Sequence, residues 1–455
     1  MARRRVEGAL RSVLARRGAA RSMVEGGQVR YEFMHPREQL VTIMRRVYGY
    51  GMTTTSGGNI SILDDDGDVW ITPGGIDKGR LTEADIVRMR GDSVVEGVHA
   101  PSSEYPFHRA IYARRPDIRA VLHAHPAALV AFSLVRKIPD TRIIPQAHEV
   151  CGSVGYAPYA IPGSEELGKN LAEAFAQGFD SVLLENHGVA TGGRDLLEAF
   201  QRFETLDFCA RTLVNASTLG PVRALTADEI ALSQKRTGLP DAEPQPRSSV
   251  ERSMRRDLRD MVQRAYRQRL MTSTEGTVSA RVDRDSFLIS PYGVDRSGIE
   301  ESDFVMVRAG RKDRGTVPSR AVVLHREIYA AQPAVNAIAS AQSPAVTAFS
   351  VTGKSLDTAT IPESYVVLRA IPVIRYGRQF NDEGALAREI TPSSPVAFLQ
   401  NDAVLTTGAT LTQAFDRLEV AEFSARAVLN AMKLGPIARI DKEALDAIAE
   451  KFGLV

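Results

Sequence analysis

Along the chain, apolar and polar residues first fall into a regular pattern after His35. Apolar side chains recur there every three or four residues, at Leu40, Ile43, Met44 and Val47. This spacing predicts an amphipathic helix. The pattern then changes: 57–61 indicates a turn that runs into a strand, and 64–68 indicates a hairpin turn before the strand residues 69–71.

A second helix and a buried strand are predicted further on. The helix follows Glu104, shows apolar residues at helical spacing and ends before Pro116. The apolar run that comes next, Val121-Leu122-His123-Ala124-His125, has two histidines one residue apart. Side chains alternate between the faces of a strand, so His123 and His125 are expected on the same side. Neutral imidazole is a ligand for zinc, iron, copper or nickel.

A third histidine and a carboxylate extend this pair. His187 follows another apolar run, in Leu184-Glu185-Asn186-His187-Gly188, and Glu104 closes the segment Pro101-Ser102-Ser103-Glu104. Three imidazoles with one carboxylate can form a tetrahedral catalytic site if substrate can displace the carboxylate. The alternative is that the histidines are ordinary polar positions on an exposed strand face.

The chain contains an internal repeat. The segment 123–133 recurs as 340–350, and at the same offset His108 recurs as His325 and Tyr112 as Tyr329. With 455 residues the chain also exceeds what one compact core usually holds. We therefore predict four parts: a basic extension over 1–35, a first domain over 36–237, a proline-rich linker over 238–250, and a second domain over 251–455.

The repeat provides a control within one chain. Every candidate ligand differs in the second copy: Asn59, Glu104, His123, His125 and His187 are replaced by Thr277, Ala321, Ser340, Gln342 and Asp402. Concerted loss at scattered positions indicates one site that only the first copy keeps. His108 recurs as His325 and is therefore interpreted as structural.

Composition and charge narrow the classes of function. The chain is 44% hydrophobic and 25% charged, and its net charge of +2 gives no sign of a nucleic-acid partner. No apolar run is long enough to span a membrane. Two cysteines, Cys151 and Cys209, make no disulfide framework, so we expect a reduced, cytoplasmic protein. The arginine-rich first 22 residues are typical of a solvated helical extension or a transit peptide.

Five segments together resemble the class II aldolase/adducin family. They are Gly58-Asn59-Ile60-Ser61, Thr72-Pro73-Gly74-Gly75, Ser102-Ser103-Glu104, His123-Ala-His125 and Asn186-His187-Gly188. The family includes fuculose-phosphate and rhamnulose-phosphate aldolases, ribulose-phosphate 4-epimerase and methylthioribulose-phosphate dehydratase. The resemblance implies an α/β fold, an α/β/α three-layer sandwich with a mostly antiparallel central sheet, here in two tandem copies. The family assembles as a four-fold ring with active sites between subunits, so we expect a homo-oligomer with a pseudo-four-fold arrangement of domains.

The resemblance also assigns roles to individual residues. It makes His123, His125 and His187 metal ligands, most readily for Zn²⁺, with Fe²⁺, Mn²⁺ and Co²⁺ as alternatives. It makes Glu104 the acid/base residue, which can also occupy the fourth coordination position. The residues implied to hold a substrate phosphate are Ser56, Asn59, Gly75, Ser102 and Ser103. Gly74 stands where family members often carry Ser or Thr. A substrate with another anionic or polar head group in place of phosphate therefore stays an alternative.

The expected function is that of a metal-dependent aldolase which cleaves a small sugar phosphate, such as a ketose 1-phosphate, by retro-aldol chemistry. The same site would also serve an epimerase, a dehydratase, or a decarboxylase or oxygenase. A non-enzymatic assembly protein of the adducin type is a further alternative, against which the intact first copy argues. The family draws a proton donor from a neighbouring subunit, and His148 is a candidate for that role.

Overall fold

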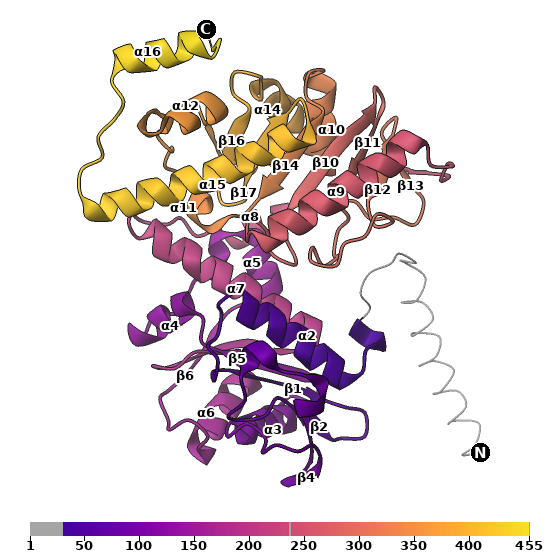
Figure 1. Ribbon diagram of the computed structural model, residues 1–455, viewed down its shortest axis with the longest axis vertical. Coiled ribbons are helices and arrows are strands. Elements are labelled where there is room, and N and C mark those ends of the chain that lie inside the picture. Colours follow the sequence, from indigo (N-terminus) through magenta and orange to yellow (C-terminus); the bar gives the residue numbers. More distant parts are fainter. Residues whose placement is uncertain (1–30, 236–237, 455) are drawn as a thin grey trace.

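The computed structural model describes residues 31–235 and 238–454, which form two α/β units, the first below the second in Figure 1. Of the predicted basic extension, only residues 31–35 fall within this part of the chain. Each unit has a central sheet with helices packed on both faces. The predicted two tandem copies of an α/β/α sandwich are therefore confirmed. The division at residues 237 and 250 stays a prediction.

The first sheet has eight strands in the order β4-β3-β2-β1-β5-β8-β7-β6, and only β6 and β7 are parallel. Its strands are β1 (Asn59–Leu63), β2 (Val69–Ile71), β3 (Val87–Arg90), β4 (Ser93–Glu96), β5 (Ala120–Ala124), β6 (Gly155–Ala157), β7 (Ser181–Leu184) and β8 (Val189–Gly193). The predicted hairpin over 57–71 is present as β1 and β2. β1 also pairs with β5, in a register that sets Asn59 opposite His123.

Two hydrophobic clusters lie on opposite faces of this sheet. α2 (Pro36–Gly49), α4 (Ala127–Leu134) and α7 (Leu196–Ala216) cover one face, whereas α3 (Tyr105–Arg114) and α6 (Glu165–Ala176) cover the other. The alternation along β5 produces this division, since Leu122 packs with α2 and α7 while Val121 packs with α3 and α6. The predicted helix after His35 is confirmed as α2, whose apolar stripe is buried.

The second sheet has nine strands in the order β15-β16-β17-β14-β10-β11-β12-β13-β9. They are β9 (Asp241–Ala242), β10 (Thr277–Asp283), β11 (Ser286–Ile289), β12 (Val305–Arg308), β13 (Arg311–Asp313), β14 (Ala337–Ala341), β15 (Val373–Ile374), β16 (Val396–Leu399) and β17 (Ala403–Gly408). Thr277 lies opposite Ser340, at the positions that Asn59 and His123 hold in the first sheet. The two copies thus share strand register at the positions that differ in chemistry.

The remaining helices are α5 of the first unit, α8 of the connection between the units, and the helices of the second unit. They are α5 (Pro145–Cys151), α8 (Ala227–Gln234), α9 (Ser249–Arg267), α10 (Val322–Ala331), α11 (Pro344–Thr352), α12 (Pro362–Leu368), α13 (Arg378–Asn381), α14 (Glu383–Glu389), α15 (Leu411–Leu434) and α16 (Lys442–Lys451). α8 lies near the boundary between the units, and α16 follows an extended segment after α15 (Figure 1). α16 contacts α12. No helix within the described ranges is long and apolar enough to cross a membrane.

The two units share an extensive interface. α7 of the first unit packs along α11 of the second, at the middle of the molecule in Figure 1. A buried polar network lies beside this contact: Arg46 of α2 bonds Asp295 at 2.6 Å and Tyr266 at 2.5 Å, and Tyr266 donates to Glu204 of α7 at 2.8 Å. Because each of these polar groups has a partner across the boundary, separating the units would leave buried charges unpaired.

Candidate metal centre

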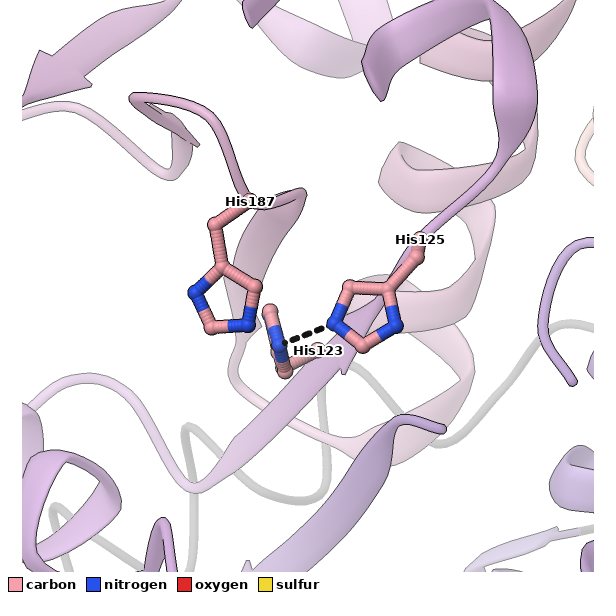
Figure 2. Close-up of side chains that lie close together, drawn as sticks. All are labelled: His123, His125 and His187. Atoms are coloured by element: carbon pink, nitrogen blue, oxygen red, sulfur yellow. Dashed lines mark hydrogen bonds between the residues drawn. The ribbon is translucent and has the colours of Figure 1, made fainter. Parts of the chain in front are cut away.

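Three histidines meet at one end of the first sheet. His123 is near the end of β5, His125 follows that strand, and His187 lies in the turn between β7 and β8. Their nearest ring nitrogens all lie within 4.8 Å of one another, and the Nε2 atoms of His123 and His125 are 3.0 Å apart. Figure 2 shows the three rings directed toward a common point. Within residues 31–235 and 238–454, no other group of three His, Cys, Asp or Glu residues is close enough to hold a metal ion.

A backbone contact fixes the orientation of His123, and two glycines allow the neighbouring loops to approach the triad. The Nδ1 of His123 lies 3.0 Å from the carbonyl oxygen of Val189, so it donates there and the Nε2 lone pair faces the other histidines. Gly188 permits the turn beside them to approach closely, because a Cβ atom there would be 2.6 Å from the carbonyl oxygen of Ala124. Gly57 does the same for the loop before β1, where a Cβ would be 3.0 Å from Nδ1 of His125.

Glu104 lies at the N-terminus of α3, beside the triad. Its Oε2 is 3.4 Å from Nε2 of His123, and its Oε1 is 3.5 Å from Nε2 of His187. Asn59 donates a hydrogen bond of 2.7 Å to Oε2, whereas Oε1 is buried without a hydrogen-bond partner among the described residues. A buried carboxylate oxygen without a donor is costly. A bound cation or a substrate hydroxyl at this point would satisfy it.

A chain of hydrogen bonds holds Asn59 in place. Its Oδ1 accepts from Nε2 of His108 at 2.5 Å, and Nδ1 of His108 lies 2.7 Å from Ser61 Oγ, which is 2.6 Å from the Tyr112 hydroxyl. Since Asn59 donates to Glu104, the proton directions follow from Tyr112 through Ser61 and His108 to Asn59. The chain therefore fixes which end of the Asn59 amide faces Glu104.

Burial keeps the histidines in the form that binds metals. It lowers the pKa of His125 to about 4, and it lowers the pKa of His123 and of His187, for which the charge of Glu104 acts in the opposite direction. The imidazoles are therefore neutral near pH 7, with lone pairs available. Three converging neutral imidazoles and a displaceable carboxylate are the donor set of a catalytic zinc or similar ion. The residues present thus fit a divalent metal.

The remaining predicted residues lie in the loops around the triad. Ser102 is buried, and its Oγ accepts from the backbone N–H of Glu104 at 3.3 Å. Ser56, Gly75 and Ser103 are exposed, and the hydrogen bonds found among the described residues do not link them to the histidines. The two loops that carry Gly75 and the serine pair are joined by a bridge between Pro73 and Pro101. The structure therefore gathers histidines, Glu104 and Asn59 at the centre, and leaves the other positions at its edge or surface.

The second unit keeps the scaffold of this site without its ligands. Ser279 Oγ bonds His325 Nδ1 at 2.8 Å and the Tyr329 hydroxyl at 2.7 Å, as in the first unit. With Thr277 in place of Asn59, Nε2 of His325 is buried without a hydrogen-bond partner among the described residues. Asp402, at the position of His187, pairs instead with Arg320 at 2.7 Å.

The sequence alone did not identify the role of His108. Its recurrence as His325 favoured a structural interpretation, and the Tyr-Ser-His part of the chain is indeed common to both units. In the first unit, however, Nε2 of His108 bonds Asn59, which in turn donates to Glu104. The loss of Asn59 in the second copy was the available signal that His108 serves a different purpose in the two units.

Comparison with known proteins extends these observations. The family described as "Class II Aldolase and Adducin N-terminal domain" matches this chain twice, at residues 38–214 and 256–429. The L-fuculose phosphate aldolase of Methanococcus maripaludis is 34% identical over 174 residues, which are 38% of this chain and 93% of that protein. The 3-oxo-tetronate 4-phosphate decarboxylase of Escherichia coli is 33% identical over 201 residues, which are 43% of this chain and 93% of that protein. The 5-deoxy-D-ribulose 1-phosphate aldolase of Bacillus thuringiensis is 34% identical over 200 residues, which are 43% of this chain and 91% of that protein.

Proposed function

Because the chain belongs to the class II aldolase and adducin family, with two matching regions, we propose that it is a metal-dependent lyase that cleaves a carbon–carbon bond of a small sugar phosphate. The observation that carries this proposal is the convergence of His123, His125 and His187 beside a buried, partly unpartnered Glu104. The three relatives described above all act on sugar-phosphate or sugar-acid phosphate compounds, which supports this class of substrate.

His123, His125 and His187 would hold the ion, with Glu104 able to occupy the fourth position until substrate displaces it. We propose Zn²⁺, with Fe²⁺, Mn²⁺ or Co²⁺ as alternatives. When bound, such an ion supplies Lewis-acid polarisation of the substrate carbonyl. The protein contributes a fixed imidazole orientation through the contact of His123 with Val189.

Glu104 is proposed to move the proton at carbon. In retro-aldol cleavage the electron pair of the breaking bond passes into an enediolate, whose carbon then takes up a proton. Asn59 holds Oε2 of Glu104, so Oε1 is the atom placed to deliver that proton or, in the reverse reaction, to remove it. Asn59, which bonds Glu104 and His108, is thereby proposed to position the carboxylate.

The phosphate is proposed to bind at the edge of the site, at Ser56, Gly75, Ser102 and Ser103. Hydroxyl groups and backbone N–H groups are donors that suit a phosphate without a fixed cation. Gly74 lies against this region, since a Cβ there would be 3.3 Å from the carbonyl oxygen of Pro101. A larger residue at position 74 would therefore require a small local shift of the Pro101 backbone.

The interface inside the chain supports a proposal for assembly. α5 of the first unit covers the second unit: Gln146 bonds the carbonyl of Thr274 at 3.5 Å, and Tyr292 bonds Glu149 at 2.8 Å. Repeating this contact between chains would bring α12, with Tyr365 at the position of His148, over the metal centre of another chain. We therefore propose a homo-oligomer with a pseudo-four-fold ring of units, in which Tyr365 joins His148 as a candidate proton donor.

Large apolar side chains that residues 31–235 and 238–454 leave exposed fit this assembly. α7 packs on α11, and the equivalent pair, α15 and α4, would have to meet between chains. Phe423 on α15 is 52% exposed, and Leu134 at the end of α4 is 61% exposed. Two large apolar side chains on these two helices indicate surfaces that a partner covers.

The proposal is tested by turnover of the metal-loaded protein on a panel of ketose 1-phosphates, with release of dihydroxyacetone phosphate as the readout. A matched panel of 3-oxo acid phosphates, with release of carbon dioxide, tests decarboxylation, which the relationship to the Escherichia coli decarboxylase favours as the second candidate. Turnover on either panel that disappears with His123→Ser supports metal-dependent lyase chemistry. Full metal occupancy without turnover on any substrate would instead favour an assembly role.

A further inference from the structure

The second unit contains a cavity at the position that corresponds to the metal centre. Its volume is about 70 Å³, and its wall includes Thr277, Ser319, Ala321, Ser340 and Asp402, the counterparts of Asn59, Ser102, Glu104, His123 and His187. About 10–15 Å³ suffices for one water molecule, so the cavity has room for a small polar molecule of several non-hydrogen atoms. The second unit thus has a pocket at this position although its residues there are not the histidines and Glu104 of the first unit.

The replacements introduce charged groups into this pocket. Arg320 takes the position of Ser103, Asp402 that of His187, and Glu275 that of Gly57. Arg320 donates to Oδ1 of Asp402 at 2.7 Å, and Gln379 donates to Oδ2 at 3.2 Å, so both oxygens of this carboxylate are satisfied. The Arg320 side chain lines the cavity and remains 23% accessible.

Two further ionisable side chains, Arg296 and Glu275, line this pocket. Arg296 is buried and donates only to the carbonyl groups of Gly276, Val294 and Pro291, and burial lowers its pKa to about 10, which leaves it charged near pH 7. Burial raises the pKa of Glu275 to about 8, which leaves this carboxyl group protonated near pH 7. Asp402 pairs with Arg320, and the nearby carboxylates Asp295 and Asp303 act on the charge of Arg296. Arg296 and Arg320 are the two arginines in the wall of the cavity, so an oxyanion bound there would lie beside both.

The pocket also offers neutral donors and spans the boundary between the units. The hydroxyl groups of Thr274, Thr277, Ser319 and Ser340 line it, and Oγ1 of Thr277 lies 2.5 Å from Oγ of Ser319. Gln146, from α5 of the first unit, completes the wall. A ligand in the cavity would therefore contact both units.

We propose that the second unit binds a small oxyanion, a phosphate or carboxylate group of a metabolite, in this cavity, held by Arg320 and the surrounding hydroxyl groups. The second copy is then a ligand-binding unit and not only a support for the first. This proposal does not depend on the reaction of the first unit, because none of its residues belongs to the metal centre.

The test is isothermal titration of the full-length protein with inorganic phosphate and, separately, with acetate. The variant Ala321→Glu restores at this position the carboxylate of the first copy and leaves the pair of Arg320 with Asp402 intact. It should weaken anion binding at least tenfold through repulsion, whereas turnover by the first unit stays unchanged. Arg320→Ser, which installs the residue of the first copy, should weaken binding to a similar degree, and the double variant His123→Ser with His125→Gln should bind as the unmodified protein does.

The two probes distinguish the two chemical sources. Tighter binding of phosphate would assign the site to a phosphate ester, and tighter binding of acetate would assign it to a carboxylate. Either result supports the proposal when Ala321→Glu and Arg320→Ser weaken it, because an anion bound only at the serines of the first unit would be unaffected by these variants. Equal binding by the unmodified protein and a folded Ala321→Glu variant would overturn it. So would the absence of binding of both anions at millimolar concentration. Circular dichroism and thermal unfolding establish that each variant is folded.

Discussion

The two units have the same fold, the same strand register and the same buried Tyr-Ser-His chain. Among the described residues, however, only the first unit presents three histidines close enough to hold a metal ion. In the first unit the chain ends on Asn59 and Glu104, whereas in the second it ends at His325 Nε2, which is buried without a hydrogen-bond partner among the described residues. The difference teaches that the scaffold tolerates complete replacement of its central polar groups. The fold therefore does not depend on the residues of the candidate metal site. The residues of one unit can be placed in the other as test substitutions that the same fold already accommodates.

The largest effect is expected when the first unit receives the ligand residues of the second. His123→Ser with His125→Gln, which copies Ser340 and Gln342, removes two of three imidazoles and should abolish tight metal binding. Loss of several kcal/mol of Lewis-acid stabilisation corresponds to about three or more decades of turnover. Metal analysis and steady-state kinetics measure the two effects. The control Ser340→Ala should change neither, and substantial turnover by the double variant would contradict the assignment.

Glu104→Gln tests the proton role with the metal kept. The amide can still coordinate weakly but cannot exchange a proton near neutral pH, so turnover should fall by about two to four decades while most of the metal is retained. Ala321→Glu in the second unit serves as the matched control and should leave turnover unchanged. Loss of metal and turnover in equal proportion would show that Glu104 is only a ligand.

Asn59→Thr copies Thr277 and should have a smaller effect. The change removes the hydrogen bond to Oε2 of Glu104 and leaves Nε2 of His108 without an acceptor, as in the second unit. A hydrogen bond to a charged group contributes about 1.5–3 kcal/mol, which corresponds to about one to two decades in kcat. Because Asn59 acts through Glu104, the pH profile of kcat should shift as well. An unchanged profile would reduce Asn59 to a structural role.

The smallest expected effect concerns the pH dependence of stability in metal-free protein. Burial lowers the pKa of His125 to about 4, so the folded state keeps this imidazole neutral where the unfolded chain, with a pKa near 6.5, takes up a proton. The contribution of His125 to the free energy of unfolding is therefore fully present above pH 6.5 and is lost as the pH falls toward 4. Since His125 is partly exposed, its share of the slope should be below about 1.4 kcal/mol per pH unit.

His125→Gln removes this contribution and copies Gln342. Chemical unfolding in the presence of a chelator, at pH 7 and pH 5, should show a shallower pH dependence for the variant. His108 and His325, whose pKa values burial lowers to about 3, are present in both proteins and cancel in the difference. An identical slope would mean that His125 is not the group that titrates.

The local elements and the pair of His123 with His125 were predictable because they depend on short-range patterns. The apolar spacing of α2, the hairpin of β1 and β2, and the alternation that sets His123 within β5 follow from the periods of helices and strands. That His187 joins the pair was suggested by its concerted loss with them, since no local pattern links residues in β5 and in the turn after β7. The assignment of His187 to the site therefore came from comparing the two copies.

Two features were not predictable in this way. Comparing the two copies identifies candidate ligands that are absent from the second unit. It does not show that Arg320, Glu275 and Asp402 line one cavity, because their proximity depends on the fold. The contact of α5 with the second unit likewise depends on how two sandwiches dock, which apolar spacing within either copy does not encode. Roles that depend on packing between distant segments thus required the structure.

The central claim is that one of the two homologous units holds the catalytic metal, and its most direct test is metal stoichiometry. Elemental analysis of purified protein, after dialysis against metal-free buffer, should give one tightly held divalent ion per chain. His123→Ser with His125→Gln should reduce this value to near zero, and Ser340→His with Gln342→His should not restore it, since Ala321 and Asp402 remain. Two tightly held ions per chain, or undiminished binding by the first double variant, would contradict the account.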